Sequence, residues 1–172
     1  ELLLRSLLEA GVDADAGIVD QKVEPLPLPL PLQQLAHLSR EGGKGGLDIW
    51  YSTISKKGDF GTPKLVNGKV NTDRDEVTPF YDSKTNTLYF SSNGWISMGG
   101  SDVYKTQADA YGKFNAVPEN LGAPFNSPCD DNYFRYGRNS EQGYLVSNRP
   151  GIFSVRGKTC CYDIFGYSYD RR

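Results

Sequence analysis

Histidine, methionine and cysteine are scarce in this 172-residue chain, which contains one His, one Met and three Cys. The imidazole of His37 would have to serve every mechanism that needs a histidine base or a histidine metal ligand, so most such mechanisms are disfavoured. Three cysteines are too few for a disulfide-built scaffold, and Cys129, Cys160 and Cys161 lack the paired C-x-x-C spacing of a zinc site. We therefore expect no cofactor and no thiolate metal centre.

The chain also lacks an excess of positive charge and any long apolar run. It has 19 Lys and Arg residues against 21 Asp and Glu residues, a formal net charge of −2, which removes the electrostatic basis for general nucleic-acid binding. No stretch approaches the roughly 20 apolar residues that cross a bilayer, so no transmembrane segment is expected. Residues 1–5 do not form the start of an export signal, which is either not encoded here or has been removed.

Aromatic residues, glycine and proline are abundant instead. The sequence holds 11 Tyr, 8 Phe and 2 Trp, together with 19 Gly and 10 Pro. Flat rings pack well on pleated sheets, and Gly and Pro supply the dihedral angles of tight turns. This composition predicts an all-β fold made of many short strands.

Residues 1–40 differ from the remainder and are assigned to a separate N-terminal segment. Leucines at positions 3, 4, 7 and 8 recur at helical spacing, and Gly11 follows them, which predicts a short helix. The run at 24–32 then alternates Pro with Leu, which excludes both a helix and a central strand and predicts an extended connector. A stiff linker is favoured over a ligand for an aromatic groove, and the second reading remains open.

From about residue 41 to residue 172 the sequence repeats. The motif Gly-Gly-x-Asp-aliphatic-aromatic ends at Trp50 and returns ending at Tyr104, so that Asp48 corresponds to Asp102 at an offset of 102 − 48 = 54 residues. A related segment places Asp163 after Asp102 at an offset of 163 − 102 = 61. Repeats of this length are typical of stacked architectures.

Each unit predicts three or four antiparallel strands. Residues 78–81 and 87–92 flank a turn-rich segment and indicate a hairpin, and the Gly-Gly motif leads into a further strand. Such a unit is a β-propeller blade, and the chain holds about 2.5 to 3 of them. Because closed propellers need about four to eight blades, we expect a partial propeller that continues in a larger protein or pairs with another chain.

The repeat resembles the WD-like β-propeller repeats of TolB type found in OmpA-family periplasmic proteins. The residues that carry the resemblance are the Gly-Gly-x-Asp motif, an Asn followed by an acidic pair, and an aromatic strand that ends Ser-Asn-Gly at 92–94 and Ser-Asn-Arg at 147–149. The resemblance implies a periplasmic, outer-membrane-associated protein, and relatives of this layout include components of type IX secretion systems. The OmpA-like module itself does not occur in this sequence.

The recurring aspartates predict structural roles. Asp48, Asp102 and Asp163 occupy equivalent positions, and a carboxylate there can accept backbone N–H groups and fix the start of a strand. Asp75 and Asp130 open the acidic pairs of two units and are expected to act in the same way. A catalytic group is needed only once, so recurrence disfavours catalysis. A calcium site built from these carboxylates and nearby carbonyls is a weaker alternative.

Several further residues are singled out for bonding or contact. A bridge between the adjacent Cys160 and Cys161 would be strained, whereas either of them, Cys160 for example, could form a disulfide with Cys129 if neighbouring units bring them together. Buried unlinked thiols are equally consistent with the sequence. Trp95 and Met98 lie in the loop before the second Gly-Gly motif, where they either contact a partner or cover a neighbouring unit.

These features favour a non-enzymatic protein-interaction scaffold of the bacterial cell envelope. Its expected partners are other envelope proteins, including peptidoglycan-linked or secretion-system components. The alternative is a carbohydrate-active or carbohydrate-binding propeller, in which two unrepeated carboxyl groups would converge in one pocket at about 5 to 9.5 Å. The aspartates of this chain recur once per unit instead, so we expect no enzymatic activity.

Overall fold

The computed structural model describes residues 34–38, 43–137, 141–151 and 162–168, which form ten strands in three antiparallel sheets. Sheet A contains β1 Gln34–Leu38, β2 Asp48–Ser52 and β3 Lys64–Leu65. Sheet B contains β4 Glu76–Asp82, β5 Thr87–Ser92, β6 Asp102–Gln107 and β7 Glu119–Asn120. Sheet C contains β8 Asp131–Tyr136, β9 Gln142–Ser147 and β10 Asp163–Ser168.

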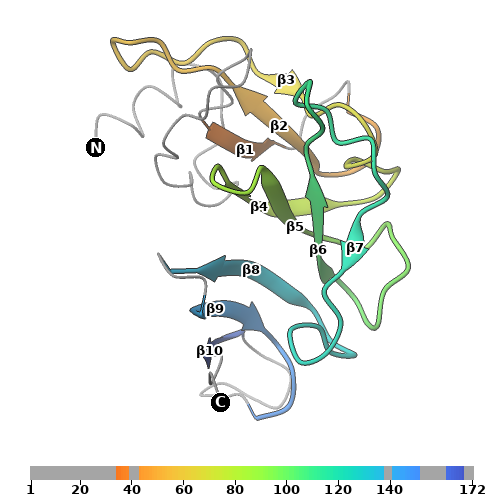
Figure 1. Cartoon of the computed structure of the whole chain (residues 1–172). Helices are drawn as coiled ribbons and strands as arrows, with labels where there is room; N and C mark the ends of the chain where they lie inside the picture. The colour runs from red at the N-terminus through yellow and green to blue at the C-terminus, as the bar shows by residue number, and fades with distance from the viewer. Residues whose placement is uncertain (1–33, 39–42, 138–140, 152–161, 169–172) are drawn as a thin grey trace.

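Each strand pairs with its neighbour in sequence, so every sheet is a meander, and sheet B lies between sheets A and C (Figure 1). The expected all-β class is confirmed for the described residues, which contain no helix. The expected N-terminal helix and the whole Pro-Leu run at 24–32 lie outside them. Strand β1 precedes the expected boundary at residue 40 and pairs with β2 over its whole length. No helix in the described part of the chain could cross a bilayer.

The sequence repeat coincides with a repeat of local geometry. Strands β4 and β8 carry the same irregularity, a register shift between Val77 and Phe80 in one and between Asn132 and Arg135 in the other. Thr78 and Tyr133 occupy the same place within these bulges, and their φ angles of 50° and 53° are in the left-handed region. Equivalent residues therefore adopt equivalent backbone conformations, including unfavourable ones.

The core between sheets A and B combines aliphatic side chains with stacked rings. Ile49 on β2 is fully buried against Leu88 and Phe90 on β5. The ring of Phe90 stacks on that of Tyr104 at 5.9 Å between centroids. Phe114, from the connection between β6 and β7, closes this core with 2% of its surface exposed. Burial of these large side chains removes enough apolar surface to hold the two small sheets together.

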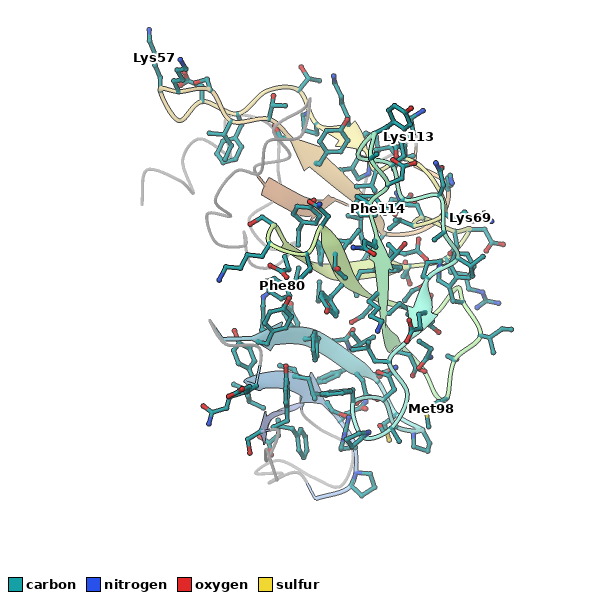
Figure 2. All side chains as sticks on the ribbon, in the orientation of Figure 1. Lys57, Lys69, Phe80, Met98, Lys113 and Phe114 are labelled. Atoms are coloured by element: carbon teal, nitrogen blue, oxygen red, sulfur yellow. The ribbon has the colours of Figure 1, made fainter. Side chains whose placement is uncertain are left out.

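The second core, between sheets B and C, is almost entirely aromatic. Phe80 and Tyr89 stack on sheet B at 5.8 Å, and the edge of Tyr136 from sheet C meets Phe80 at 5.0 Å. Tyr89 also contacts Phe134 at 5.0 Å. In Figure 2, Phe80 occupies the space between the two sheets. Sheet B is therefore covered on both faces, which explains why its strands do not alternate strictly between apolar and polar residues.

Candidate functional site

The junction between sheets A and B is built by an acidic residue that binds the loop before β2. The Asp75 carboxylate accepts a hydrogen bond from the Leu47 amide at 2.8 Å. Backbone bonds flank this contact, from the Gly46 amide to the Arg74 carbonyl at 3.0 Å and from the Glu76 amide to the Leu47 carbonyl at 2.6 Å. Three parallel contacts thus attach the loop before β2 to the first residues of sheet B.

The same junction recurs between sheets B and C. The Asp130 carboxylate accepts from the Ser101 amide at 3.0 Å. The Gly100 amide donates to the Cys129 carbonyl at 3.2 Å, and the Asp131 amide donates to the Ser101 carbonyl at 2.6 Å. We call each of these three-bond arrangements a latch. Because it joins two different sheets, the latch fixes how one sheet sits on the next.

The glycine doublet is required by close approach at the latch. A Cβ atom on Gly45 would lie 2.4 Å from the backbone of the acidic turn, and one on Gly46 would lie 2.2 Å from the Asp75 carboxylate. Gly99 and Gly100 are under the same constraint, with the nearest atoms at 2.4 and 2.0 Å. None of these four glycines has a positive φ, so their backbone conformation does not require glycine. Glycine is needed because the next sheet passes close to the loop.

An asparagine at the end of the middle strand holds each latch aspartate in place. The Asn93 side-chain oxygen accepts from the Asp75 amide at 3.0 Å. Asn148 accepts from the Asp130 amide at 2.8 Å, and its side-chain nitrogen donates to the Asp130 carboxylate at 3.0 Å. The Tyr162 hydroxyl donates to the same carboxylate at 3.0 Å. The acidic side chains thus serve as acceptors for donors from several segments.

The aspartates of the Gly-Gly-x-Asp motif are buried. Asp48 accepts through Oδ2 from the Lys44 and Gly45 amides at 2.8 and 3.2 Å. Asp102 accepts through Oδ2 from the Met98 amide at 2.6 Å and from the Asn120 side chain at 2.8 Å. In both residues Oδ1 is buried without a hydrogen-bond partner among the described groups.

Asp163 holds the equivalent position as the first residue of β10, and it is half-buried. Its backbone pairs with Ser147 on β9, as that of Asp102 pairs with Ser92 on β5. The structural role expected for these aspartates and for the latch aspartates stays a prediction. The contacts seen for Asp48, Asp75, Asp102 and Asp130 make this prediction specific, because each carboxylate accepts a backbone amide of a loop that precedes a strand.

Two buried asparagines, for which the sequence analysis predicts no role, bond to the backbone of the strands that follow the Gly-Gly motif. Asn126 accepts from the Val103 amide at 2.8 Å and donates to the Val103 carbonyl at 2.8 Å. Asn71 makes the same pair of bonds to Ile49, at 2.8 and 3.0 Å. Each side chain gives a buried strand amide its acceptor and shares the carbonyl of the same residue with a backbone donor. The signal for them was present, because Asn71 and Asn126 recur at an offset of 126 − 71 = 55 residues.

The second acid of each pair is also buried, but its surroundings differ between units. Glu76 accepts from the Thr72 amide at 2.7 Å and hydroxyl at 2.6 Å and from the Ser92 hydroxyl at 2.7 Å. Burial raises the pKa of Glu76, and the negative charge of Asp48 adds to this effect. No cationic group contacts the Glu76 carboxylate among the contacts of the described residues.

Asp131, the equivalent of Glu76, pairs with an arginine side chain. Its carboxylate forms an ion pair with Arg149 at 2.6 Å and accepts from the Ser127 amide at 2.6 Å. The Arg149 guanidinium also donates to the carbonyls of Pro124, at 2.9 Å, and Phe125. At the position of Arg149 the preceding unit has glycine. Glu76, whose pKa is raised, therefore stands in that unit where the next unit has Asp131 paired with Arg149.

The negative charge of Asp48 acts on Glu76, so these two carboxylates lie near one another, whereas the latch aspartates Asp75 and Asp130 belong to different junctions. Each follows the register of its own sheet and binds groups of the adjacent loop. Within the described ranges, no three His, Cys, Asp or Glu side chains gather in a group that could hold a metal ion. The hydrogen bonds of these acids fix loops and the first residues of strands.

The residues expected to contact a partner divide into two groups. Trp95 packs against the core between sheets A and B, and its indole nitrogen donates to the Val70 carbonyl at 3.4 Å. Ile96 and Met98 extend outward from the same loop, with 95% and 48% of their surfaces exposed, and Figure 2 places Met98 at the edge of the molecule. Trp95 thus covers part of a neighbouring sheet, and Ile96 and Met98 are the large apolar side chains that this loop exposes.

Cys129 is half-buried at the second latch and forms no disulfide with another described residue. Its expected partner Cys160 lies outside the described residues, so the Cys129–Cys160 link stays a prediction. His37 lies on β1, where its backbone pairs with Ile49.

Comparison with protein-family models, with curated proteins and with solved structures found no match.

Proposed function

We propose that the three sheets are successive blades of a β-propeller and that the protein is a non-enzymatic scaffold for protein interactions in the bacterial cell envelope. Four-stranded meanders stacked face to face in chain order are the building units of propellers. Sheet B is such a meander, and sheets A and C have the same strand order with three strands described in each.

The observation that carries the non-enzymatic proposal is the duplication of the latch. Asp75 and Asp130 bind the same backbone positions of the preceding sheet at nearly the same distances. Groups that recur in every unit with backbone partners are committed to architecture, whereas an active site needs its acids once and in contact with a substrate.

The surface proposed to bind a partner is the loop between β5 and β6. Ile96 and Met98 are exposed there, while the partly buried Trp95 side chain packs on the core and fixes the loop. Two further bonds hold this loop, from the Tyr104 hydroxyl and the Asn120 side chain to the Ile96 carbonyl at 2.8 and 3.4 Å. Apolar side chains on a rigid loop present contact area at little cost in conformational entropy.

The envelope location and the secretion-related partners follow from the resemblance of the repeat to TolB-type propellers of OmpA-family proteins. The proposed protein is periplasmic and outer-membrane-associated, and its partners are other envelope proteins, including peptidoglycan-linked or secretion-system components. A carbohydrate-binding or carbohydrate-active propeller is the second candidate, favoured only by the number of acidic and aromatic residues.

The test compares envelope proteins retained by the wild-type chain and by the double variant Ile96→Asp, Met98→Asp. We expect a specific protein to be retained by the wild type, to bind it in purified form, and to be lost from the double variant. Tyr111→Asp is the matched control, because Tyr111 is 78% exposed in the connection between β6 and β7. Equal retention by all three proteins, or hydrolysis of a polysaccharide that depends on one unrepeated acid, would contradict the proposal.

A further inference from the structure

Each of the first two sheets has one face covered by the next sheet along the chain, which we call its forward face. On sheet A this face carries Ile49, which is fully buried against sheet B. On sheet B it carries Tyr89 and Val103; Val103 is fully buried, and Tyr89 contacts Phe134 of sheet C. The same strand positions are thus apolar and covered in two successive sheets.

The forward face of sheet C carries equivalent residues that are open to solvent. Tyr144 on β9 corresponds to Tyr89 and is 46% exposed, and Ile164 on β10 corresponds to Val103 and is 73% exposed. The strand register places Ile164 opposite Val146 and Tyr144 opposite Gly166, so the four residues lie on one face. No residue of β9 or β10 on this face is charged. A sheet surface of this kind favours an apolar partner.

The latch gives a second, independent observation. The donor amides of the two observed latches belong to Leu47 and Ser101, immediately before Asp48 and Asp102. The corresponding residue of sheet C is Tyr162, immediately before Asp163, and its amide has no acceptor among the described groups. The hydrogen-bonding half of a third latch is therefore present next to the open face.

We propose that the forward face of sheet C is the docking surface for one further sheet of this same repeat. That sheet carries apolar and aromatic side chains over Tyr144 and Ile164, as sheet C does over Tyr89. An Asp at the start of its first strand accepts the Tyr162 amide, as Asp130 accepts the Ser101 amide. The inference rests on the proposed stacking of the sheets as blades and does not involve the loop that carries Ile96.

The test extends the full chain by a second copy of residues 58–107 after Arg172, because Arg172 corresponds to residue 57 at the offset of 163 − 48 = 115 residues. In the repeat register this segment supplies a last strand for sheet C and then the β4–β6 hairpins with their buried faces. Hydrogen exchange of the Tyr162 amide and thermal unfolding are measured in the parent and in the extended chain. We expect exchange at Tyr162 to slow by about tenfold or more on extension.

Ile164→Lys provides the matched mutational readout. In the parent this substitution falls on an exposed side chain, and we expect little change in melting temperature. In the extended chain it would bury a lysine, and we expect a drop of about 4 °C or more. Tyr111→Lys, at an exposed position away from sheet C, is the control and should act alike in both chains.

Three results would overturn the inference. The first is a folded extension that leaves Tyr162 exchange and the Ile164→Lys effect as they are in the parent. The second is self-association of the parent through this face that Ile164→Lys abolishes and that the added segment does not prevent. The third is an added segment that stays unfolded both as residues 58–107 and as residues 58–121, because docking should stabilise it. None of these results affects the retention experiment on Ile96 and Met98, so the two proposals fail separately.

Discussion

Replacement of Glu76 by Gln tests whether the buried acids serve architecture. Glu76 is fully buried, and its carboxylate accepts hydrogen bonds from Thr72 and Ser92. Burial raises its pKa above the ordinary value of 4.5. The folded protein therefore binds the proton more tightly than the unfolded chain does. The Glu76 contribution to stability is complete below pH 4.5 and is lost as the pH rises from there through the folded-state pKa.

The magnitude follows from this linkage. Between the unfolded and folded pKa values, the contribution of Glu76 to the free energy of unfolding falls by about 1.4 kcal/mol per pH unit. Gln keeps the shape of the side chain, its oxygen can accept the Thr72 amide, and its NH₂ group can donate to the Thr72 and Ser92 hydroxyls. We expect Glu76→Gln to be at least as stable as the wild type at pH 7, with an advantage that shrinks as the pH falls toward 4.5.

Urea unfolding of both proteins between pH 4.5 and 8 measures the difference directly, because other titrating groups cancel. Asp131→Asn is the matched control at the equivalent position, where the carboxylate pairs with Arg149 at 2.6 Å. Loss of that pair should destabilise the protein by about 2–3 kcal/mol at pH 7. A Glu76→Gln protein that is less stable than the wild type by more than about 1 kcal/mol at pH 7, with an unchanged pH dependence, would refute the reasoning.

Three further substitutions or measurements address the other contacts. Asn126→Ala should lower the free energy of unfolding by about 1–3 kcal/mol, since the buried Val103 amide loses its acceptor while the Val103 carbonyl keeps the Leu121 amide at 3.1 Å, and an unchanged urea midpoint would contradict this. Gly99→Ala should cost about 1–3 kcal/mol in the same assay, because its Cβ would lie 2.4 Å from a backbone carbon, whereas Gly166→Ala, with its nearest atom at 3.9 Å, should be neutral. Non-reducing mass spectrometry of the thiol-alkylated protein should show Cys129 linked to Cys160, and three alkylated cysteines would dismiss the link.

Sequence alone established the all-β class and the repeating unit. Aromatic residues with Gly and Pro indicated short strands, and the return of Asp48 as Asp102 gave the period. This succeeded because equivalent units need equivalent groups at equivalent positions, so the constraint is written into the order of residues. The recurrence of the bulge residues Thr78 and Tyr133 shows how far that correspondence extends into backbone geometry.

Tertiary structure decided what those recurring residues touch. From the sequence, the Gly-Gly doublet was expected only to lead into a strand, whereas the structure shows that Gly46 makes room for the Asp75 carboxylate of the next sheet. Trp95 could equally have faced a partner until its packing on the core was seen. Such roles depend on contacts between segments about 20 to 30 residues apart, which pattern and composition do not record. The order of residues determined which groups recur. The packing of one sheet on another determined which atoms each of these groups contacts.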